Sequence, residues 1–369
     1  TITLAIGVNR MAQRNAIIRK LPAVEALGSA TVVCSDKTGT LTENQMTVQA
    51  IYVEGQHYQV SGGGYSPKGE ITLVTSDGSP IEDGLPHPLE TCLTAGVLCN
   101  DAQLKHTGEH WTVIGDPTEG ALITAAAKAD LSQAGLAAAI PRLDSIPKES
   151  EYQYMATLHD AESRTIYVKG SVEALLRRCT HMLNQQGQVV SIVPAAIEQA
   201  VELMTAQALR VLAFAQKYVA AHQHSIDHDD IATDLVFLGL QGMIDPPRPE
   251  AIAAVHTCQN AGIQIKMITG DHISTAQAIA KRMGIRKTNE VLAFEGQKLA
   301  DMDDTELRQV VETGDVFARV APAQKLRLVE ALQAKGEIVA MTGDVVYEAT
   351  ALKQADIGVA MGKGGTEVA

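Results

Sequence analysis

An aspartate early in the chain directly follows a predicted buried strand, a position where reactive residues of α/β proteins are often found. Asp36 ends a β-branched apolar run, residues 30–35, that is typical of such a strand. Two later apolar runs end in the same manner, in the loops 269–271 and 342–344, and each loop contains an aspartate. The sequence therefore predicts three strands that each end in a polar, acid-bearing loop.

The carboxyl ends of parallel strands lie at one edge of a sheet, where ligands of open α/β proteins bind. We expect Asp36, Thr269 and Asp344 to meet at this edge. Lys325, from a later predicted helix, joins them. Carboxylates that gather there repel one another unless a cation joins them, and Mg²⁺ held by carboxylates and phosphate oxygens is the usual solution. Asp36 is then the nucleophile that forms an aspartyl-phosphate, while Thr269 and Lys325 hold the phosphoryl oxygens.

The elements that must position these residues alternate regularly in the last third of the chain. Helical periodicity and apolar strand patterns follow one another there, which predicts βαβ units and a parallel sheet. The predicted helices cover residues 249–261, 273–283 and 323–334. The strand before Asp36 has the same character, although it lies far upstream. The simplest arrangement is a doubly wound α/β domain built from residues 21–44 and 244–369.

The intervening residues, 45–243, have a different character. They mix alternating strand patterns with helical periodicity and turn clusters such as residues 61–64, which is typical of an α+β domain. We expect this region to be inserted after the first strand of the doubly wound domain. Residues 1–20 join a short apolar start to a basic stretch, the composition of a cytoplasmic membrane flank or of a solvated helix face.

Length and composition limit the classes of protein to consider. The chain has 369 residues, of which 46% are hydrophobic and 20% charged, and its formal net charge is −13. These values suit two or three globular domains and disfavour nucleic acid as a partner. Five cysteines without a CxxC pair fit a reducing compartment. Since no apolar run reaches the roughly 18 residues of a spanning helix, we expect any transport pathway to lie outside this chain.

The residues around Asp36 resemble a known signature. Residues 34–47 read CSDKTGTLTENQMT, which is similar to the phosphorylation signature of P-type ATPases, in the branch of calcium, sodium/potassium and proton pumps. Further matches are GDPTEGAL at 115–122, KGSVE at 169–173, LRVLA at 209–213, MITGD at 267–271 and FARV at 317–320. The resemblance implies a haloacid-dehalogenase-like phosphorylation (P) domain, interrupted by an inserted nucleotide-binding (N) domain.

The resemblance also implies roles for single residues. Asp36 would be phosphorylated, and Mg²⁺ would be bound by Asp36, Asp344 and the main-chain carbonyl of Thr38. Gly270, Asp271 and Arg319 would line the phosphate side with Thr269 and Lys325. The nucleotide pocket would contain Thr118, Glu119, Lys169, Gly170 and Arg210. The implied partners are ATP, a transported cation, and membrane helices and an actuator domain of the same polypeptide, so that this chain is the cytoplasmic portion of an integral membrane protein.

The residue two positions after the nucleophile separates two kinds of enzyme. Dehalogenase-like phosphatases carry a second Asp there, which acts as a general acid and base and speeds hydrolysis of the intermediate. Thr38 stands at this position, and its hydroxyl cannot do that work at neutral pH. Thr38 therefore favours a pump with a long-lived phosphoenzyme, and a soluble phosphatase or phosphotransferase is one alternative.

Two stretches depart from the family pattern. Between residues 342 and 352 four family residues are replaced, by Val345, Tyr347, Glu348 and Thr350, which is expected to reshape the loop after Asp344. These changes support a second alternative, a catalytically impaired nucleotide-binding module.

The other departure is Lys148, which stands where relatives have a Phe that stacks on adenine, an interaction worth roughly 1–3 kcal/mol. Tyr152 and Tyr154 are the nearby aromatic substitutes. Three histidines further along, His222, His224 and His228, lie in an acidic loop and are expected to be solvated.

Overall fold

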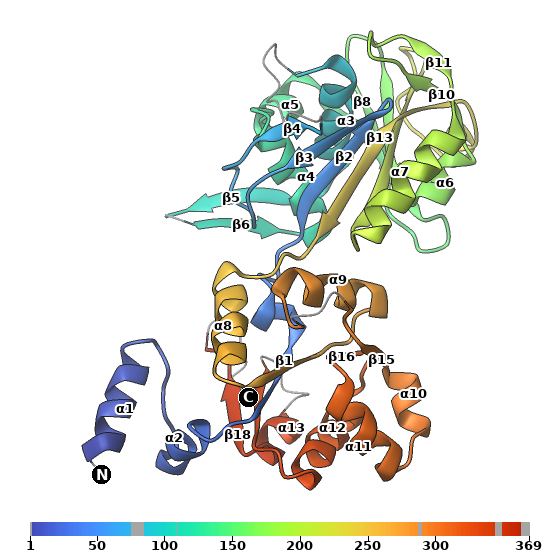
Figure 1. Cartoon of the computed structure of the whole chain (residues 1–369). Helices are drawn as coiled ribbons and strands as arrows, with labels where there is room; N and C mark the ends of the chain where they lie inside the picture. The colour runs from blue at the N-terminus through green and yellow to red at the C-terminus, as the bar shows by residue number, and fades with distance from the viewer. Residues whose placement is uncertain (1, 75–84, 109, 287–289, 344–348, 363–369) are drawn as a thin grey trace. The chain divides into compact units, whose positions relative to one another are not determined.

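The computed structural model describes residues 2–74, 85–108, 110–286, 290–343 and 349–362. The chain divides into two compact units (Figure 1), one made of residues 1–44 and 247–369 and the other of residues 45–246. Each unit has its own sheet and its own hydrophobic core. Within the described ranges, no helix is both long enough and apolar enough to cross a membrane.

A parallel sheet organises the unit that contains Asp36. Its strands are β1 (Val32–Asp36), β14 (Gln264–Ile268), β15 (Ala293–Glu295), β16 (Val316–Ala318), β17 (Val339–Gly343) and β18 (Ile357–Ala360). In the part of the chain that the structure describes, they lie in the order β15-β16-β14-β1-β17-β18, and every pair is parallel. From β1 the chain passes to β14 on one side and returns later to β17 on the other. This reversal makes a doubly wound sheet, in which ligands bind at the strand ends beside β1.

Two helices precede the first strand of this unit, and the others alternate with its later strands, as the βαβ pattern predicts. They are α1 (Ile2–Ala12), α2 (Leu21–Leu27), α8 (Pro249–Asn260), α9 (Ile273–Met283), α10 (Gly296–Asp301), α11 (Asp304–Thr313), α12 (Pro322–Ala334) and α13 (Ala349–Gln354). The core of the unit contains fully buried residues of β1, such as Val32 and Cys34, with Leu328 and Val329 of α12. Each buried aliphatic side chain contributes roughly 1.5–3 kcal/mol, which fixes α12 against the sheet.

An antiparallel sheet organises residues 45–246. Its strands are β2 (Thr47–Val53), β3 (Gln56–Val60), β4 (Ile71–Leu73), β7 (Arg142–Ile146), β8 (Tyr154–His159), β9 (Thr165–Gly170), β10 (Cys179–Leu183), β11 (Val189–Ser191), β12 (Arg210–Tyr218) and β13 (Leu235–Ile244). The described strands run in the order β4-β3-β2-β13-β12-β9-β8-β7; β10 pairs in parallel with β13 and antiparallel with β11. A separate hairpin consists of β5 (Gln103–Thr107) and β6 (His110–Ile114).

Helices complete this second unit. They are α3 (His87–Leu98), α4 (Pro117–Ala127), α5 (Gln133–Ala139), α6 (Val172–Leu176) and α7 (Pro194–Ala206). α3 and α4 pack against each other and against strands β2 and β13. Their buried residues, among them Leu89, Leu93 and Leu122, form the core with Phe214 of β12. The predicted mixture of strands and helices in this region is confirmed, as is the parallel α/β sheet of the other unit.

The boundaries of single elements follow the sequence patterns closely. The helix predicted over 273–283 is α9, which begins and ends at those residues, because His272 caps it and Gly284 ends it in the left-handed conformation with φ 68°. The helix predicted over 249–261 ends at Asn260, and the one predicted over 323–334 begins one residue earlier. The first strand starts later than residue 30 and includes Asp36 itself.

Candidate active site

Asp36 and Lys325 meet at the carboxyl end of the central strand. Strand β1 ends at Asp36, which is 7% exposed. α12 starts with Pro322, a residue suited to the first helical position, and so carries Lys325 in its first turn. The Nζ atom of Lys325 lies 2.8 Å from Oδ1 of Asp36. A nearly buried carboxylate thus faces a nearly buried ammonium at the point of the sheet where ligands bind.

The loop after β14 lies beside this pair. Asp36 is opposite Ile268 in the parallel ladder, so Thr269 follows at the neighbouring strand end. The Thr269 hydroxyl accepts a hydrogen bond from the Asp271 main-chain N–H at 3.1 Å, which leaves its own proton to donate to a ligand. Thr269 itself is 1% exposed.

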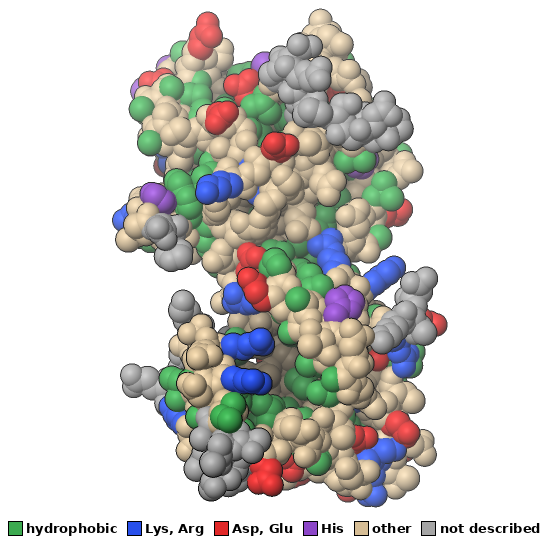
Figure 2. Space-filling view, turned by 60° about the vertical axis from the view of Figure 1, so that its left-hand side comes forward, with side chains coloured by type: hydrophobic (Ala, Val, Ile, Leu, Met, Phe, Trp, Pro, Cys, Tyr) green, Lys and Arg blue, Asp and Glu red, His purple; other side chains and the backbone are tan. Residues whose placement is uncertain are grey.

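Lys37 is a member of this cluster that the sequence analysis did not assign. Its Nζ lies 2.6 Å from Oδ2 of Asp271, and its side chain is 6% exposed. The signal for it was its position directly after Asp36 in the sequence. Asp36 and Asp271 each face a lysine, and these two cations offset the repulsion expected between acids at this edge. In Figure 2 several Lys and Arg side chains of this unit lie beside a hollow in its surface.

The turn after Asp36 is shaped by a glycine. Gly39 has φ 73°, which a residue with a Cβ adopts at a cost, and its carbonyl accepts a hydrogen bond from Arg248 at 3.1 Å. Thr38 is half-buried and extended, with φ −72° and ψ 129°. Asp344, the further metal ligand expected from the resemblance, lies outside the described residues, together with Val345, Tyr347 and Glu348. Among the residues that are described, no group of three or more His, Cys, Asp or Glu side chains could hold a metal ion.

The two remaining expected phosphate-side residues differ in their surroundings. Arg319 is exposed and has φ 52°, and its main-chain N–H donates to the Asp271 carbonyl at 3.0 Å. A non-glycine residue in this conformation has a strained backbone. The hydrogen bond between Arg319 and Asp271, which joins the loops after β16 and β14, therefore forms at a cost in backbone strain. Gly270 is exposed, and an added Cβ would meet no atom within 4 Å.

Cys34 precedes the nucleophile candidate by two residues and is chemically quiet. It is fully buried in β1. This burial raises the pKa of its thiol to about 12, against the opposing effect of the Lys266 ammonium. A thiol with such a pKa carries no thiolate at neutral pH, so the sulfur does not compete with Asp36 as a nucleophile.

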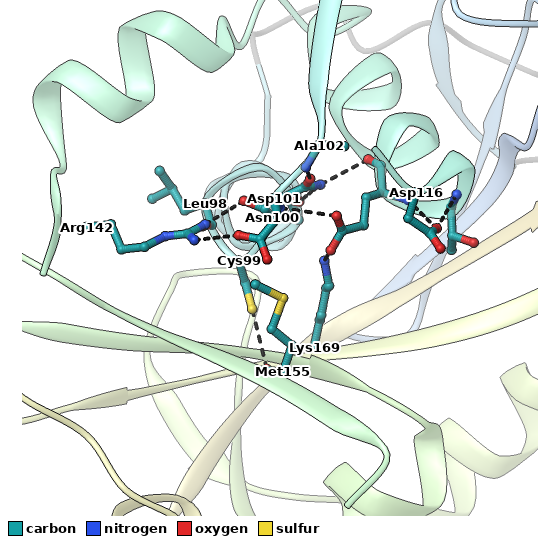
Figure 3. A network of polar contacts seen from close by, with 12 residues as sticks. Leu98, Cys99, Asn100, Asp101, Ala102, Asp116, Arg142, Met155 and Lys169 are labelled. Carbon is teal, nitrogen blue, oxygen red and sulfur yellow. Dashed lines mark hydrogen bonds and ion pairs between the residues drawn. The ribbon is translucent and has the colours of Figure 1, made fainter. Parts of the chain in front are cut away.

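In the other unit, Glu119 and Lys169 form the charged pair of the expected nucleotide pocket. Lys169 comes from β9 and Glu119 from the first turn of α4, and Nζ lies 2.5 Å from Oε1 (Figure 3). Their side chains are 6% and 16% exposed. The Asp116 carboxylate caps α4 by accepting from the main-chain N–H groups of Thr118 and Glu119. Partial burial acts to raise the pKa of Asp116, but the hydrogen bonds from Thr118 and Glu119 together outweigh it, so that the pKa is lowered.

The second oxygen of Glu119 is also held. The Asp101 main-chain N–H donates to Oε2 at 3.2 Å. The Asn100 side chain fixes this turn by donating to the carbonyls of Gly96 and Glu119 and accepting from Ala102 (Figure 3). Arg142 of β7 also stabilises this turn. One of its nitrogens lies 2.6 Å from Oδ1 of Asp101, and another donates a hydrogen bond to the Leu98 carbonyl. Sequence patterns gave no signal for this network.

The other expected pocket residues have mixed surroundings. Thr118 is half-buried at the start of α4, and Arg210 is exposed at the start of β12. Strand β12 pairs with β9, which contains Lys169 and Gly170. Arg210 therefore lies on the strand next to that of Lys169. Gly170 is buried, and a Cβ there would lie 2.5 Å from the Gln153 carbonyl oxygen. Close packing alone therefore accounts for a glycine at this position.

Lys148 lies near the Asp116 cap of α4, whereas Tyr154, one of the suggested substitutes, and Lys169 point to different faces of the sheet. Lys148 is exposed, and its charge helps to lower the pKa of Asp116, which caps α4. Tyr154 is opposite Gly170 and Met155 is opposite Lys169, so Tyr154 and Lys169 point to different faces of the sheet. The ring of Tyr152, whose centroid is 6.0 Å from that of Tyr154, stacks on His228.

The expectation that His228 is solvated is wrong. Its ring stacks on Tyr152 with centroids 4.0 Å apart, and its Nδ1 is 2.6 Å from the Tyr154 hydroxyl. His224 is exposed, with Nδ1 3.4 Å from an Arg164 nitrogen. The pairing of aromatic rings across a loop and a strand leaves no periodic signal in the sequence.

The chain thus combines a doubly wound parallel sheet, which carries a buried, lysine-paired aspartate at a strand end, with an antiparallel-sheet unit that contains a second charged pair. Residues 88–250 match the family model described as P-type ATPase, cytoplasmic domain N. The chain is similar over its whole length to the cation-transporting ATPase pma1 of Synechocystis sp., with 71% identity, and to a probable cation-transporting ATPase F of Mycobacterium tuberculosis, with 48% identity. A calcium-transporting ATPase of Bacillus subtilis is 41% identical over the whole chain.

Over its whole length the chain is therefore similar to a part of the P-type cation-transporting ATPases. It spans 41% of the length of each of these three relatives.

Proposed function

We propose that this chain binds ATP and transfers its γ-phosphoryl group to Asp36, as the phosphorylation (P) and nucleotide-binding (N) domains of a cation-pumping P-type ATPase. The P domain has the haloacid-dehalogenase-like fold and comprises residues 21–44 and 244–369; the N domain, residues 45–243, is inserted in it. The observation that carries the proposal is the Asp36–Lys325 pair at the end of the central strand, with 2.8 Å between Oδ1 and Nζ.

The transfer is a displacement at phosphorus. A carboxylate oxygen of Asp36 attacks the γ-phosphorus, and the bond from this atom to the oxygen shared with the β-phosphate breaks. The electron pair of that bond leaves with ADP, so the step requires no proton. The Lys325 ammonium lies beside the Asp36 carboxylate, and its positive charge stays beside the phosphoryl oxygens as negative charge develops on them. The Thr269 hydroxyl donates to one of the same oxygens.

Mg²⁺ fits the donors that the site offers. The Asp36 carboxylate and the Thr38 main-chain carbonyl are hard oxygen ligands, which Mg²⁺ prefers over nitrogen or sulfur, and Asp344 is proposed as the third ligand. When bound, Mg²⁺ supplies positive charge to the phosphoryl group. Lys37 neutralises Asp271, so that Gly270, Asp271 and Arg319 line the phosphate side without adding a net negative charge.

The N-domain pair is proposed to bind the nucleotide. Glu119 and Lys169 offer an acceptor and a donor side by side, and Arg210 is the exposed cation on the neighbouring strand. Thr118 lies in the first turn of α4, and Gly170 allows close packing beside Lys169.

As a cytoplasmic portion of a longer protein, the chain would work with membrane helices and an actuator domain of the same polypeptide to move a cation. The names of two relatives that are 41% and 43% identical, both calcium-transporting ATPases, support a calcium-like cation.

Incubation with Mg²⁺ and γ-labelled ATP tests the proposal. We expect an acid-stable, hydroxylamine-sensitive label, with a low yield because of the changes at 345–350. Rapid turnover of small phosphomonoesters would instead support a dehalogenase-like phosphatase. Binding of ATP in the absence of any label would support a catalytically impaired nucleotide-binding module.

A further inference from the structure

The turn that leads from β16 into α12 is held by one glutamine side chain. Oε1 of Gln324 accepts a hydrogen bond from the Ala321 main-chain N–H at 2.8 Å. Nε2 of the same side chain donates to the Gly296 carbonyl oxygen at 2.6 Å. Gln324 thus links the start of α12 to the start of α10, and the next residue in the chain is Lys325.

Gly296 must be a glycine for this contact to form. A Cβ added there would lie 2.2 Å from the Arg319 carbonyl oxygen and 2.8 Å from Oε1 of Gln324. The position of the Arg319 carbonyl depends in turn on the left-handed conformation of Arg319, whose N–H bonds to the Asp271 carbonyl. The contact therefore connects α10, the Arg319 turn and the loop that carries Thr269 and Asp271.

We propose that Gln324, seated against Gly296, is a positioning residue for Lys325 and thereby for phosphoryl transfer to Asp36. The inference rests on the proposed function for its catalytic consequence, but the positional claim stands on geometry alone. Gln324 touches neither Asp36 nor a ligand site directly. It acts through the orientation of the first turn of α12.

The physical reason is the lack of a capping side chain at the start of α12. The first N–H groups of a helix have no partner within it, and Ala321 at the N-cap has no side chain that could accept from them. Oε1 of Gln324 binds the N-cap N–H, as the third residue of a capping box does, and Nε2 fixes the turn against α10. Lys325 is one residue further on, so a rotation of this turn displaces its Nζ from Asp36.

The test is the reactivity of the Lys325 amine in the folded full chain, measured by limited acetylation with acetic anhydride and mass spectrometry. Lys325 is 7% exposed and bonded to Asp36, so it reacts slowly in the unaltered protein. In Gln324→Met, which has a similar volume but no polar group, acetylation of Lys325 should rise about fivefold, the factor for roughly 1 kcal/mol of lost hydrogen bonding. Gly296→Ala should raise it in the same way by pushing the Arg319 turn away.

Gln333 offers a matched control on the same helix. Its Nε2 also makes side-chain bonds, to the Gln354 carbonyl and Asp356, but at the far end of α12. Gln333→Met should leave acetylation of Lys325 within twofold of the unaltered protein. Unchanged reactivity in both Gln324→Met and Gly296→Ala, or an equal rise in Gln333→Met, would overturn the proposal.

The rate of phosphorylation is the second measurement that tests the proposal. At saturating ATP, Gln324→Met should lower the rate of label formation about tenfold, while the ATP concentration for half-maximal rate stays within twofold, because loss of the link acts after binding. In a Lys325→Ala background Gln324→Met should have no further effect. A rate loss that persists in that background would show a merely structural role. Absence of label from the unaltered chain would contradict the proposed function alone, since the acetylation result would still decide the positional claim.

Discussion

The two charged sites of this protein use the same kinds of residue in different settings. Asp36 and Lys325 come from a strand end and a helix start that are 289 residues apart in sequence, at the edge of a parallel sheet where ligands bind. Glu119 and Lys169 lie between α4 and an antiparallel sheet, and both oxygens of Glu119 are held, one by the main chain. We infer that the first pair serves chemistry at a strand end, whereas the second is also part of the fold.

The largest expected effect on stability therefore belongs to the second pair. Lys169→Met leaves the Glu119 carboxylate buried with no lysine, which should lower the free energy of unfolding of residues 45–246 by about 3–5 kcal/mol. Trp111, the single tryptophan of the chain, lies in this unit, so its fluorescence in a urea titration follows the loss. The double variant Lys169→Met, Glu119→Gln should recover most of it.

Lys325→Met is the matched change in the other unit. It should leave the Trp111 transition unchanged, because Lys325 belongs to the unit built from residues 1–44 and 247–369. An equal shift of this transition in both variants would remove the distinction between the two pairs. A loss below about 1 kcal/mol in Lys169→Met would mean that the buried pair is only as important as a surface ion pair.

The next effect concerns acid. Burial lowers the pKa of His159 in β8 to about 4, and its Nδ1 lies 3.1 Å from the Ile140 carbonyl oxygen. Between pH 6.5, the ordinary pKa of histidine, and pH 4, the unfolded chain binds a proton that the folded chain does not, so stability falls as pH falls through this window. Between pH 7 and pH 5 this group should remove about 2 kcal/mol from the stability of residues 45–246.

The matched measurement compares this pH dependence with that of His159→Gln, again by Trp111 fluorescence in urea. Other groups titrate equally in both proteins, so the difference between the two slopes isolates His159. Parallel pH profiles would show that His159 is protonated in the folded state at pH 5, against the burial seen here.

The smallest effect should come from Lys148→Phe. Lys148 is exposed near the α4 cap, and Tyr154 and Lys169 point to different faces of the sheet, so Tyr154 does not supply an aromatic ring beside Lys169 in place of the family's Phe. A gain of about 1 kcal/mol from stacking should tighten ATP binding roughly fivefold in a calorimetric titration. The gain should not depend on Mg²⁺, and Glu149→Phe, at the next exposed position, is the control. Equal affinities of Lys148→Phe and the unaltered chain would place Lys148 outside the pocket.

The active-site loops could be predicted from the sequence because each follows a continuous apolar strand. Asp36 and Thr269 stand at the point where such a run ends, and strand ends of a parallel sheet share an edge. The helix over residues 273–283 could be predicted in the same way, from its periodicity and from the glycine that ends it. These signals are local, so they survive without knowledge of the partner elements.

What could not be predicted depends on contacts between distant segments. The Lys37–Asp271 pair requires the register of β1 against β14, and the support of Glu119 by the Asp101 main chain leaves no side-chain pattern. Tyr154 pairs with Gly170, and this register decides which face of the sheet its side chain lies on. A shift of the register by one residue would place Tyr154 on the same face as Lys169. The departures at 345–348 lie outside the described residues.

The central claim is that Asp36 accepts the phosphoryl group, and the location of the label tests it most directly. After incubation with Mg²⁺ and γ-labelled ATP, Asp36→Asn should carry no acid-stable, hydroxylamine-sensitive label. Asp315→Asn is the matched control, because Asp315 lies in the same unit with a side-chain exposure of 13%, against 10% for Asp36, and is paired with Arg286. Asp315→Asn should be labelled as the unaltered chain is. Label that persists in Asp36→Asn would contradict the account.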